Sequence, residues 1–239
     1  MKTASSGTRS ATPQSRLRAT LLQNGLSLVI AILFVASMVG QILSGARQYN
    51  EERLEHGEPI VALSAYLTSG HFLEATAENW ESEFLQMAAY VLLTACLFQK
   101  GSSESKNPEK TEGVNRDPRE AHGRKLKDAP WPVRRGGWML RFYEYSLSIA
   151  FVLLFLISFL LHAAGGVVVH NELGLLHGDA PISMVEYLGS SQFWFESFQN
   201  WQSEFLSLAA MVVLTIFLRQ RGSPESKPVD APHSQTGSE

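Results

Sequence analysis

Several residue types and motifs are scarce or missing in this chain of 239 residues, and each absence narrows the range of functions. The single cysteine, Cys96, excludes an intramolecular disulfide, and its apolar neighbours favour a packing role. A net charge of -3 gives no bulk basicity that would point to nucleic acid as a partner. The sequence holds no nucleophile elbow, P-loop, zincin helix or dinucleotide fingerprint. We therefore expect a protein that is not an enzyme and that carries no cofactor.

Charged residues are almost absent from two long apolar stretches, Leu21–Ser44 and Phe142–Val169, each long enough to cross a bilayer core as a helix. Two shorter runs, Phe84–Phe98 and Phe205–Leu218, reach roughly 28 Å of helix when each is extended back to the tryptophan before it. A buried core helix is the alternative for these shorter runs. The pattern predicts an all-α membrane protein with four transmembrane helices.

Lysine and arginine are nearly missing from the two loops that connect the predicted spans within each half of the chain. Gly45–Glu83 holds Arg47 and Arg53 alone, Asn171–Glu204 holds neither residue type, and 18 of the 20 cationic residues lie in the termini and the central linker. Cations concentrate on the cytoplasmic side of membrane proteins, so both termini and the linker are predicted to be cytoplasmic. The first apolar run exceeds the about 7–15 residues of a signal peptide, which favours a retained anchor.

The chain repeats itself at a spacing of 121 residues. Residues 49–106, aligned with 170–227, give 27 identities in 58 pairs without a gap. Each copy contains two spans, so both copies have the same orientation, and the axis that relates them runs along the membrane normal. The expected architecture is two parallel two-helix repeats in one bundle.

The external loops of both copies predict amphipathic outer helices. Pro59 and Pro181 each precede a segment suited to a short helix with proline in its first turn. The segments "FLEATAENWESEF" and "FWFESFQNWQSEF" are expected to continue into the second span of each repeat. The predicted organisation is a disordered cytoplasmic tail (1–20), membrane repeat 1 (21–106), a disordered cytoplasmic linker (107–138), membrane repeat 2 (139–227) and a disordered cytoplasmic tail (228–239).

The repeated Asn-Trp-x-Ser-Glu-Phe-Leu places Glu83 and Glu204 at equivalent positions. At the outer edge of a helix, the macrodipole stabilises such an anion by roughly 0.3–1 kcal/mol, and this structural role is favoured. The alternative is an ion or proton site made by the two carboxylates across the axis between the copies. His162, toward the outer end of the third apolar run, is predicted to pack or to hydrogen-bond between helices rather than to serve as a ligand.

His56 with Glu58, and His177 with Asp179, repeat a histidine followed two residues later by a carboxylate. A glycine turn is the favoured interpretation, because a glycine separates the two residues of each pair. The alternative is a metal site in which the two pairs converge, although their spacing matches no closed ligand motif. No metal is therefore predicted, and these four residues remain the metal candidates.

The Asn-Trp-x-Ser-Glu-Phe-Leu motifs at 79–85 and 200–206, and Gly-Ser-x-Glu-Ser-Lys at 101–106 and 222–227, carry a family likeness. The chain resembles a bacterial family of small uncharacterised inner-membrane proteins with a domain of unknown function, over about residues 21–227. The resemblance implies a bacterial source, a helical membrane fold and a multi-pass inner-membrane location. It implies no activity, substrate or catalytic residue.

Two hypotheses on function follow. The first is a non-enzymatic integral membrane protein that acts by packing, partner binding or envelope organisation, because no charged residue falls in the middle of a predicted span. The second is a small transporter, channel or accessory subunit that uses the paired outer-face glutamates and histidines. The expected partners are the lipid bilayer and a second copy or another membrane protein, with no nucleic acid.

Overall fold

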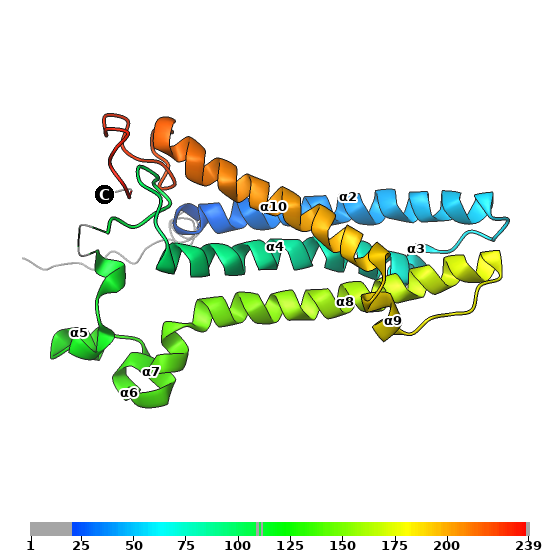
Figure 1. Cartoon of the computed structure of the whole chain (residues 1–239), viewed down its shortest axis with the longest axis horizontal. Coiled ribbons are helices and arrows are strands. Elements are labelled where there is room, and N and C mark those ends of the chain that lie inside the picture. The colour runs from blue at the N-terminus through cyan, green and yellow to red at the C-terminus, as the bar shows by residue number, and fades with distance from the viewer. Residues whose placement is uncertain (1–20, 109, 111, 238–239) are drawn as a thin grey trace, which may run out of the picture. The chain divides into compact units, whose positions relative to one another are not determined.

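A computed structural model describes residues 21–108, 110 and 112–237, and these residues form helices and loops without a strand (Figure 1). The predicted tail at 1–20 lies outside the described residues. The chain divides into two compact units, one up to Leu67 and one from Thr68 onward. This boundary falls inside the first sequence repeat, and each unit is described by itself.

Unit 1 contains the long helix α2 (Gly25–Glu55) and the single turn α3 (Leu63–Tyr66). The helix ends at His56, and Gly57 follows with φ of 75°, a left-handed conformation that glycine adopts without strain. Proline was expected in the first turn of the short helix, but Pro59 lies four residues before α3 begins. Helix α3 starts later because the Asn50 side chain forms hydrogen bonds with both backbone groups of Val61, which keeps that residue outside the helix.

Asn50 and Asn171 make the same contact in the two copies of the repeat. The Asn50 amide donates to the Val61 carbonyl at 3.1 Å and accepts from its N–H at 2.8 Å. Asn171 makes the equivalent pair of bonds to Ile182, at 3.0 and 2.8 Å. Both hydrogen-bonding groups of one loop residue are thus used outside a helix, which holds the preceding loop extended.

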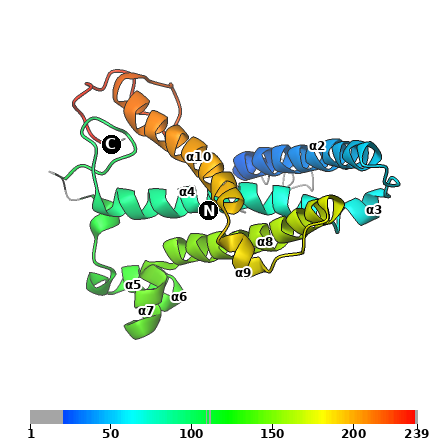
Figure 2. The same cartoon turned by 45° about the vertical axis from the view of Figure 1, so that its right-hand side comes forward.

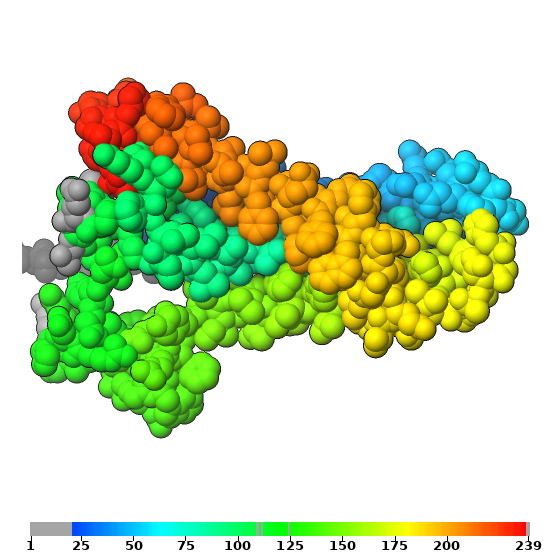
Figure 3. All heavy atoms as spheres, in the orientation of Figure 1, coloured from blue at the N-terminus to red at the C-terminus, as the bar shows by residue number. Residues whose placement is uncertain are grey.

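Unit 2 is built around α4 (Gly70–Cys96), α8 (Ser146–His177) and α10 (Ser191–Phe217), with the short α9 (Met184–Leu188) before α10. Helices α4 and α8 lie side by side and run in opposite directions, as Figure 1 and Figure 2 both show. Helix α10 crosses α4 and runs in the same direction, and its side chains lie over those of α4 in Figure 3.

Small residues let α4 and α8 approach closely. A Cβ added to Gly165 would lie 2.5 Å from the backbone nitrogen of Glu74, and one added to Gly70 would lie 2.8 Å from Cβ of Val168. Backbone contact of this kind requires glycine, as in many helix pairs of membrane proteins. The two helices therefore make backbone contact at Glu74, a residue of the site described below.

The two copies also match in how their second helices begin. Helices α4 and α10 both have 27 residues, and their first residues are 121 positions apart. Ser69 accepts a hydrogen bond from the Phe72 N–H at 3.2 Å, and Ser190 accepts one from Phe193 at the same distance. A serine N-cap thus starts each helix well before the repeated Asn-Trp motif.

A tyrosine lies against a glycine in each unit as well. Tyr66 and Tyr187 are both fully buried, and they occupy equivalent positions of the repeat. A Cβ added to Gly45 would lie 2.1 Å from the Tyr66 hydroxyl, and one added to Gly166 would lie 2.4 Å from that of Tyr187. These glycines are themselves 121 residues apart, outside the stretch of aligned identities.

The central linker differs from the disordered segment expected from its polarity. Its described residues include the short helical segments η1 (Gly113–Asn115), η2 (Pro118–Glu120), α5 (Arg124–Asp128) and α6 (Trp131–Arg135), and α7 (Gly137–Glu144) begins at its end. Asp117 caps η2 through the Arg119 N–H, and the Arg119 guanidinium lies 2.9 Å from a Glu144 oxygen. Local caps and ion pairs thus supply order that composition alone does not predict.

The C-terminal segment, also expected to be disordered, is held by contacts as far as its described residues extend. The ammonium of Lys227, 1% exposed, donates to the carbonyls of Gly101, His233 and Gln235. The Gly101 N–H donates to the Thr236 hydroxyl at 2.9 Å. In Figure 3 the red end of the chain accordingly lies against the green loop at Gly101.

Within the described part of the chain, three helices, α2, α8 and α10, are long and apolar enough to cross a membrane. Helix α4 was expected as a fourth span. It is not apolar enough over a span's length to be included, because its first half carries four glutamates. Only 13 residues follow Glu83 before the helix ends at Cys96, which is roughly 20 Å of apolar helix. The outward faces of the three apolar helices carry many exposed large hydrophobic side chains, such as Leu153, Leu160 and Phe195.

Candidate functional site

Helix α4 carries three glutamates on one face. Glu74, Glu78 and Glu81 are spaced by four and three residues, so one stripe of the helix holds all three carboxylates. Glu81 is completely buried, whereas the neighbouring Glu83 is exposed. The stripe faces α8 and α10, and residues of those two helices complete a partly buried group of polar side chains.

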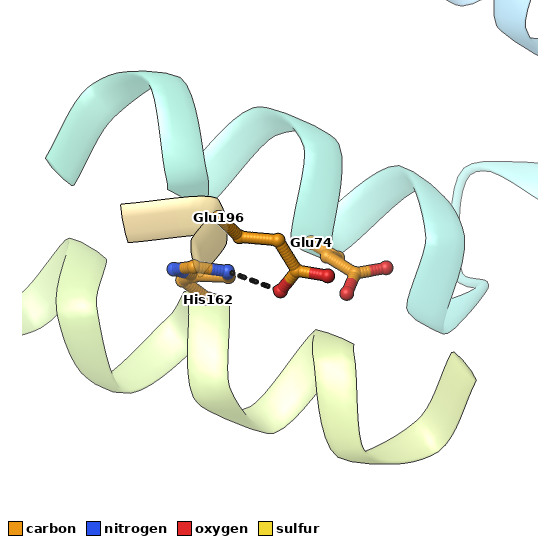
Figure 4. A group of neighbouring side chains, drawn as sticks. All are labelled: Glu74, His162 and Glu196. Carbon is orange, nitrogen blue, oxygen red and sulfur yellow. Dashed lines mark ion pairs between the residues drawn. The ribbon is translucent and has the colours of Figure 1, made fainter. Parts of the chain in front are cut away.

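His162 of α8 lies at the centre of this group and is completely buried. Its Nδ1 lies 2.8 Å from Oε2 of Glu81, and its Nε2 lies 3.5 Å from Oε2 of Glu196 on α10. Figure 4 shows the ring between the ribbons of α4 and α8, with Glu196 and Glu74 on the same side of it. One imidazole therefore joins three helices through two carboxylates.

The Glu81 and Glu196 carboxylates have further donors that hold them in place. The indole N–H of Trp201 donates to Oε1 of Glu81 at 2.9 Å. The Gln192 amide donates to Oε1 of Glu196 at 3.0 Å. Buried carboxylates need such partners, because a carboxylate deprived of water and of donors costs several kcal/mol.

Tyr187 of α9 links the remaining glutamate to this group. Its hydroxyl lies 2.9 Å from a Glu196 oxygen and 3.4 Å from a Glu74 oxygen. Burial raises the pKa of the Tyr187 phenol, and the hydrogen bond to Glu196 raises it further. The phenol therefore stays neutral and donates to a carboxylate. We call Glu74, Glu81, His162, Tyr187 and Glu196 the polar cluster.

Glu78, one turn beyond Glu74 on the same stripe, has a separate partner. It accepts a hydrogen bond from the side-chain amide of Asn200, which also donates to the Glu196 carbonyl at 3.2 Å. This contact joins α4 to α10 beside the polar cluster. Asn200 belongs to the repeated Asn-Trp motif, so one copy of the motif contributes to helix packing.

Aromatic rings surround the polar cluster on the side of α8 and α10. The His162 and Phe193 ring centroids are 4.8 Å apart, and Phe159 contacts Phe193 at 5.1 Å. Phe155 contacts Trp201 at 6.2 Å. These rings form an apolar wall, and charge interactions behind such a wall are stronger than in water.

The polar cluster has the composition of a cation site. It combines three carboxylates with one imidazole, so negative charge is in excess even when the imidazole is protonated. Ligand atoms of Glu74, His162 and Glu196 all lie within 4.8 Å of one another. A group of this kind can hold a proton shared among carboxylates or bind a metal ion through nitrogen and oxygen.

The structure places the predicted pair Glu83 and Glu204 outside the polar cluster. Glu83 is exposed and Glu204 is half-buried. Both lie in the middle of their helices, 13 residues after the first residue, so stabilisation by a helix end does not apply to them. Gln86 donates to the Glu204 carbonyl at 2.9 Å, which fixes the backbone there. An ion site at the two side chains stays a prediction.

The four metal candidates lie in turns at the ends of α2 and α8. Nδ1 of His56 lies 2.8 Å from the Glu52 carbonyl, and Nδ1 of His177 lies 2.9 Å from that of Leu173. Glu58 pairs with Arg53 at 2.8 Å. The Asp179 N–H donates to the Gly174 carbonyl, as in a helix C-terminal turn.

His56 and Glu58 belong to unit 1, whereas His177 and Asp179 belong to unit 2. The glycine of each pair has positive φ, 75° at Gly57 and 83° at Gly178, as the turn interpretation requires. Each turn ends a long helix, α2 or α8.

A family model for the "Domain of unknown function (DUF6766)" matches residues 17–238, so the chain belongs to that family. No match was found among curated proteins or among solved structures. The family membership agrees with the predicted likeness to an uncharacterised domain family.

Sequence reasoning missed the polar cluster, although one signal was available. The stripe at Glu74, Glu78 and Glu81 follows helical spacing within a segment treated only as amphipathic. His162 was assigned to packing or to a hydrogen bond between helices, and its contact with Glu81 is a contact of that kind. Its second contact, with Glu196, could not be predicted without the position of α10.

Proposed function

We propose that the protein crosses a bacterial inner membrane four times, with α4 as the fourth span. The support is the packing of α4 along α8: a helix that lies beside a membrane span has the same depth. The glutamate stripe of α4 faces the bundle interior, where intramembrane carboxylates are normally found. Helices α4 and α10 also run in the same direction, as parallel repeats require.

The proposed orientation leaves both termini and the linker in the cytoplasm. Its support is the charge distribution, with 18 of the 20 cationic residues in those three segments. His162 is the 17th residue of α8, about 24 Å along the helix from Ser146. In a hydrocarbon layer of about 30 Å, the polar cluster then lies near the outer boundary.

We infer that the protein is a small, non-enzymatic cation transporter that binds its cation at the polar cluster. One observation carries this inference: three carboxylates, of which Glu81 is buried, gather around the buried His162 between helices whose outward sides are apolar. Ionisable residues inside a membrane usually mark ion or proton pathways. Four helices are few for a transporter, so we expect a homodimer, which cross-linking in membranes would detect.

The test is cation uptake by purified protein in liposomes that contain a pH-sensitive dye or a metal-sensitive dye. The wild type should take up protons or a divalent cation, and E196Q should lower the rate at least tenfold, because the cluster loses a charge next to His162. The matched control is the double variant E83Q and E204Q, which changes two glutamates of the same helices outside the cluster. It should transport like the wild type.

Loss of uptake in the control, with normal uptake in E196Q, would show that the repeated pair forms the site and that the cluster does not. Uptake absent from the wild type in both dye assays, under an imposed gradient and membrane potential, would count against transport altogether.

The second candidate function is packing or partner binding in the envelope, as the sequence analysis favours. Its specific support is that Glu81 and Glu196 already have donors in the structure, so the cluster also fastens three helices. In that case E196Q should lower the thermal unfolding temperature in detergent while liposomes of the wild type show no uptake. Co-purification in mild detergent followed by mass spectrometry would then identify the partner.

A further inference from the structure

We propose that Glu74, His162 and Glu196 bind a divalent first-row transition metal ion of the Zn²⁺ class. This inference deepens the proposed function and rests on it, because it names the class of cation that the polar cluster takes. The three residues come from α4, α8 and α10, and their ligand atoms lie within 4.8 Å of one another. The ion would thus join all three long helices of unit 2.

The histidine supplies an observation that is independent of the carboxylates. His162 is completely buried, and among the described residues its Nε2 has no hydrogen-bond partner. Nearly all buried polar atoms in native proteins have a hydrogen-bond partner, whereas this nitrogen has only a long ion-pair contact, which requires an explanation. This nitrogen is directed at Glu196, 3.5 Å away, on the side where Glu74 also lies (Figure 4). A metal ion bound between them would satisfy it.

Glu81 occupies the position of a carboxylate that orients a metal-binding histidine. Its Oε2 lies 2.8 Å from Nδ1 of His162, on the opposite side of the ring from Nε2. A carboxylate there holds the proton on Nδ1 and leaves the Nε2 lone pair for the metal, as in many zinc sites. The Trp201 indole, bonded to Glu81 at 2.9 Å, fixes that carboxylate in turn.

The distances suit tetrahedral coordination after a small adjustment. Ligands bound at about 2.0–2.2 Å in a tetrahedron are roughly 3.4 Å apart. His162 Nε2 and Glu196 Oε2 already have this separation, at 3.5 Å. Glu74 has to approach by at most about 1.4 Å, since the three ligand atoms lie within 4.8 Å of one another. Tyr187 lies beside both carboxylates and can keep a hydrogen bond to either one.

The donor set decides the class of ion. Imidazole favours zinc, iron, nickel and copper, and carboxylate favours harder ions such as manganese, so a mixed set without sulfur selects borderline divalent ions. Two carboxylates neutralise a divalent charge in surroundings that are poor in water. Three protein ligands leave a fourth position for water, which is typical of exchangeable sites rather than of closed structural ones.

The experiment uses the full chain in mild detergent, stripped with a chelator and then titrated with Zn²⁺ alone. The wild type should bind about one ion per chain, and E74Q and E196Q should each weaken binding by at least about 100-fold, since each removes a ligand. E81Q should weaken it by about 10- to 100-fold, the usual effect of an orienting partner. The matched control is E83Q, also on α4, which should bind like the wild type.

Substitution with Co²⁺ gives a readout that needs no variant, because a buried cluster can lose its fold when a member is changed. The wild-type spectrum should be that of four-coordinate Co²⁺ with nitrogen and oxygen ligands. A spectrum like that of the hydrated ion, or less than about a tenth of an equivalent of bound Zn²⁺, would overturn the proposal. Unchanged affinity in both E74Q and E196Q, with folding intact, would overturn it as well.

The outcomes separate this inference from the proposed function. Proton uptake that depends on Glu196 in a protein without bound Zn²⁺ would refute the metal site and leave transport in place. One tightly bound ion per chain, with no cation uptake by liposomes, would support the metal site and refute transport.

Discussion

Replacement of Gly165 by alanine tests the close approach of α4 and α8. The new Cβ would lie 2.5 Å from the backbone nitrogen and 2.8 Å from Cα of Glu74. Those atoms belong to a helix backbone, so α4 itself has to move. Overpacking costs about 1–3 kcal/mol, and a displaced helix backbone places G165A at the upper end of that range. Alanine regains about 1 kcal/mol through its higher helix propensity. The free energy of unfolding should therefore fall by about 2 kcal/mol.

A second glycine of α8 provides the control, because the same substitution there should have the opposite sign. A Cβ at Gly174 would meet only Cβ of Asp179, at an ordinary 3.5 Å. The variant G174A should therefore gain about 0.5–1 kcal/mol from helix propensity. Reversible unfolding in mixed detergent, followed by tryptophan fluorescence, measures both variants against the wild type. G165A as stable as G174A would refute the packing described for α4 and α8.

Three further predictions concern the loops and the C-terminal segment. N171A leaves both hydrogen-bonding groups of Ile182 unpaired and should lower the free energy of unfolding by about 1–3 kcal/mol, measured in the same unfolding assay; no change would contradict the loop geometry. The Ser183 N–H lowers the pKa of Glu186 from 4.5, so this pair stabilises the fold above the unfolded-state pKa and loses its effect as the pH falls through the folded one. E186Q should thus flatten the acid side of a stability profile against pH, and an unaltered profile would count against this hydrogen bond. K227M leaves the carbonyl oxygens of Gly101, His233 and Gln235 without this donor and should speed limited proteolysis of residues 228–237, whereas an unchanged cleavage rate would show that the ammonium does not hold that segment.

The apolar runs and the duplication predicted much of the helical pattern. The uncharged run Leu21–Ser44 lies largely within α2, and the spacing of 121 residues recurs in the first residues of α4 and α10. Both features depend on local sequence, because a helix needs only apolar periodicity and a suitable cap. The short helices of the linker depend on individual caps and on the ion pair from Arg119 to Glu144, which average composition conceals.

The polar cluster escaped prediction because the sequence search followed identities between the two copies. Except for Tyr187, whose counterpart is Tyr66, its residues have different counterparts at a spacing of 121: Phe195 for Glu74, Gln202 for Glu81, Ala75 for Glu196 and Gln41 for His162. The repeated residues Glu83 and Glu204 were predicted as the candidate ion site, yet Glu83 is exposed and Glu204 is half-buried. Contacts among three helices depend on their rotation about their own axes, and periodicity within one helix does not determine that rotation.

One chain that contains both copies can place different side chains at equivalent positions. Two identical single-copy subunits, related by a twofold axis, would present every residue twice, so a group with one histidine could arise only as a symmetric pair. Glu81 comes from the first half of the duplication, whereas His162 and Glu196 come from the second. Covalent fusion of the two copies therefore permits one asymmetric group of charged side chains, and neither half expressed alone would contain it.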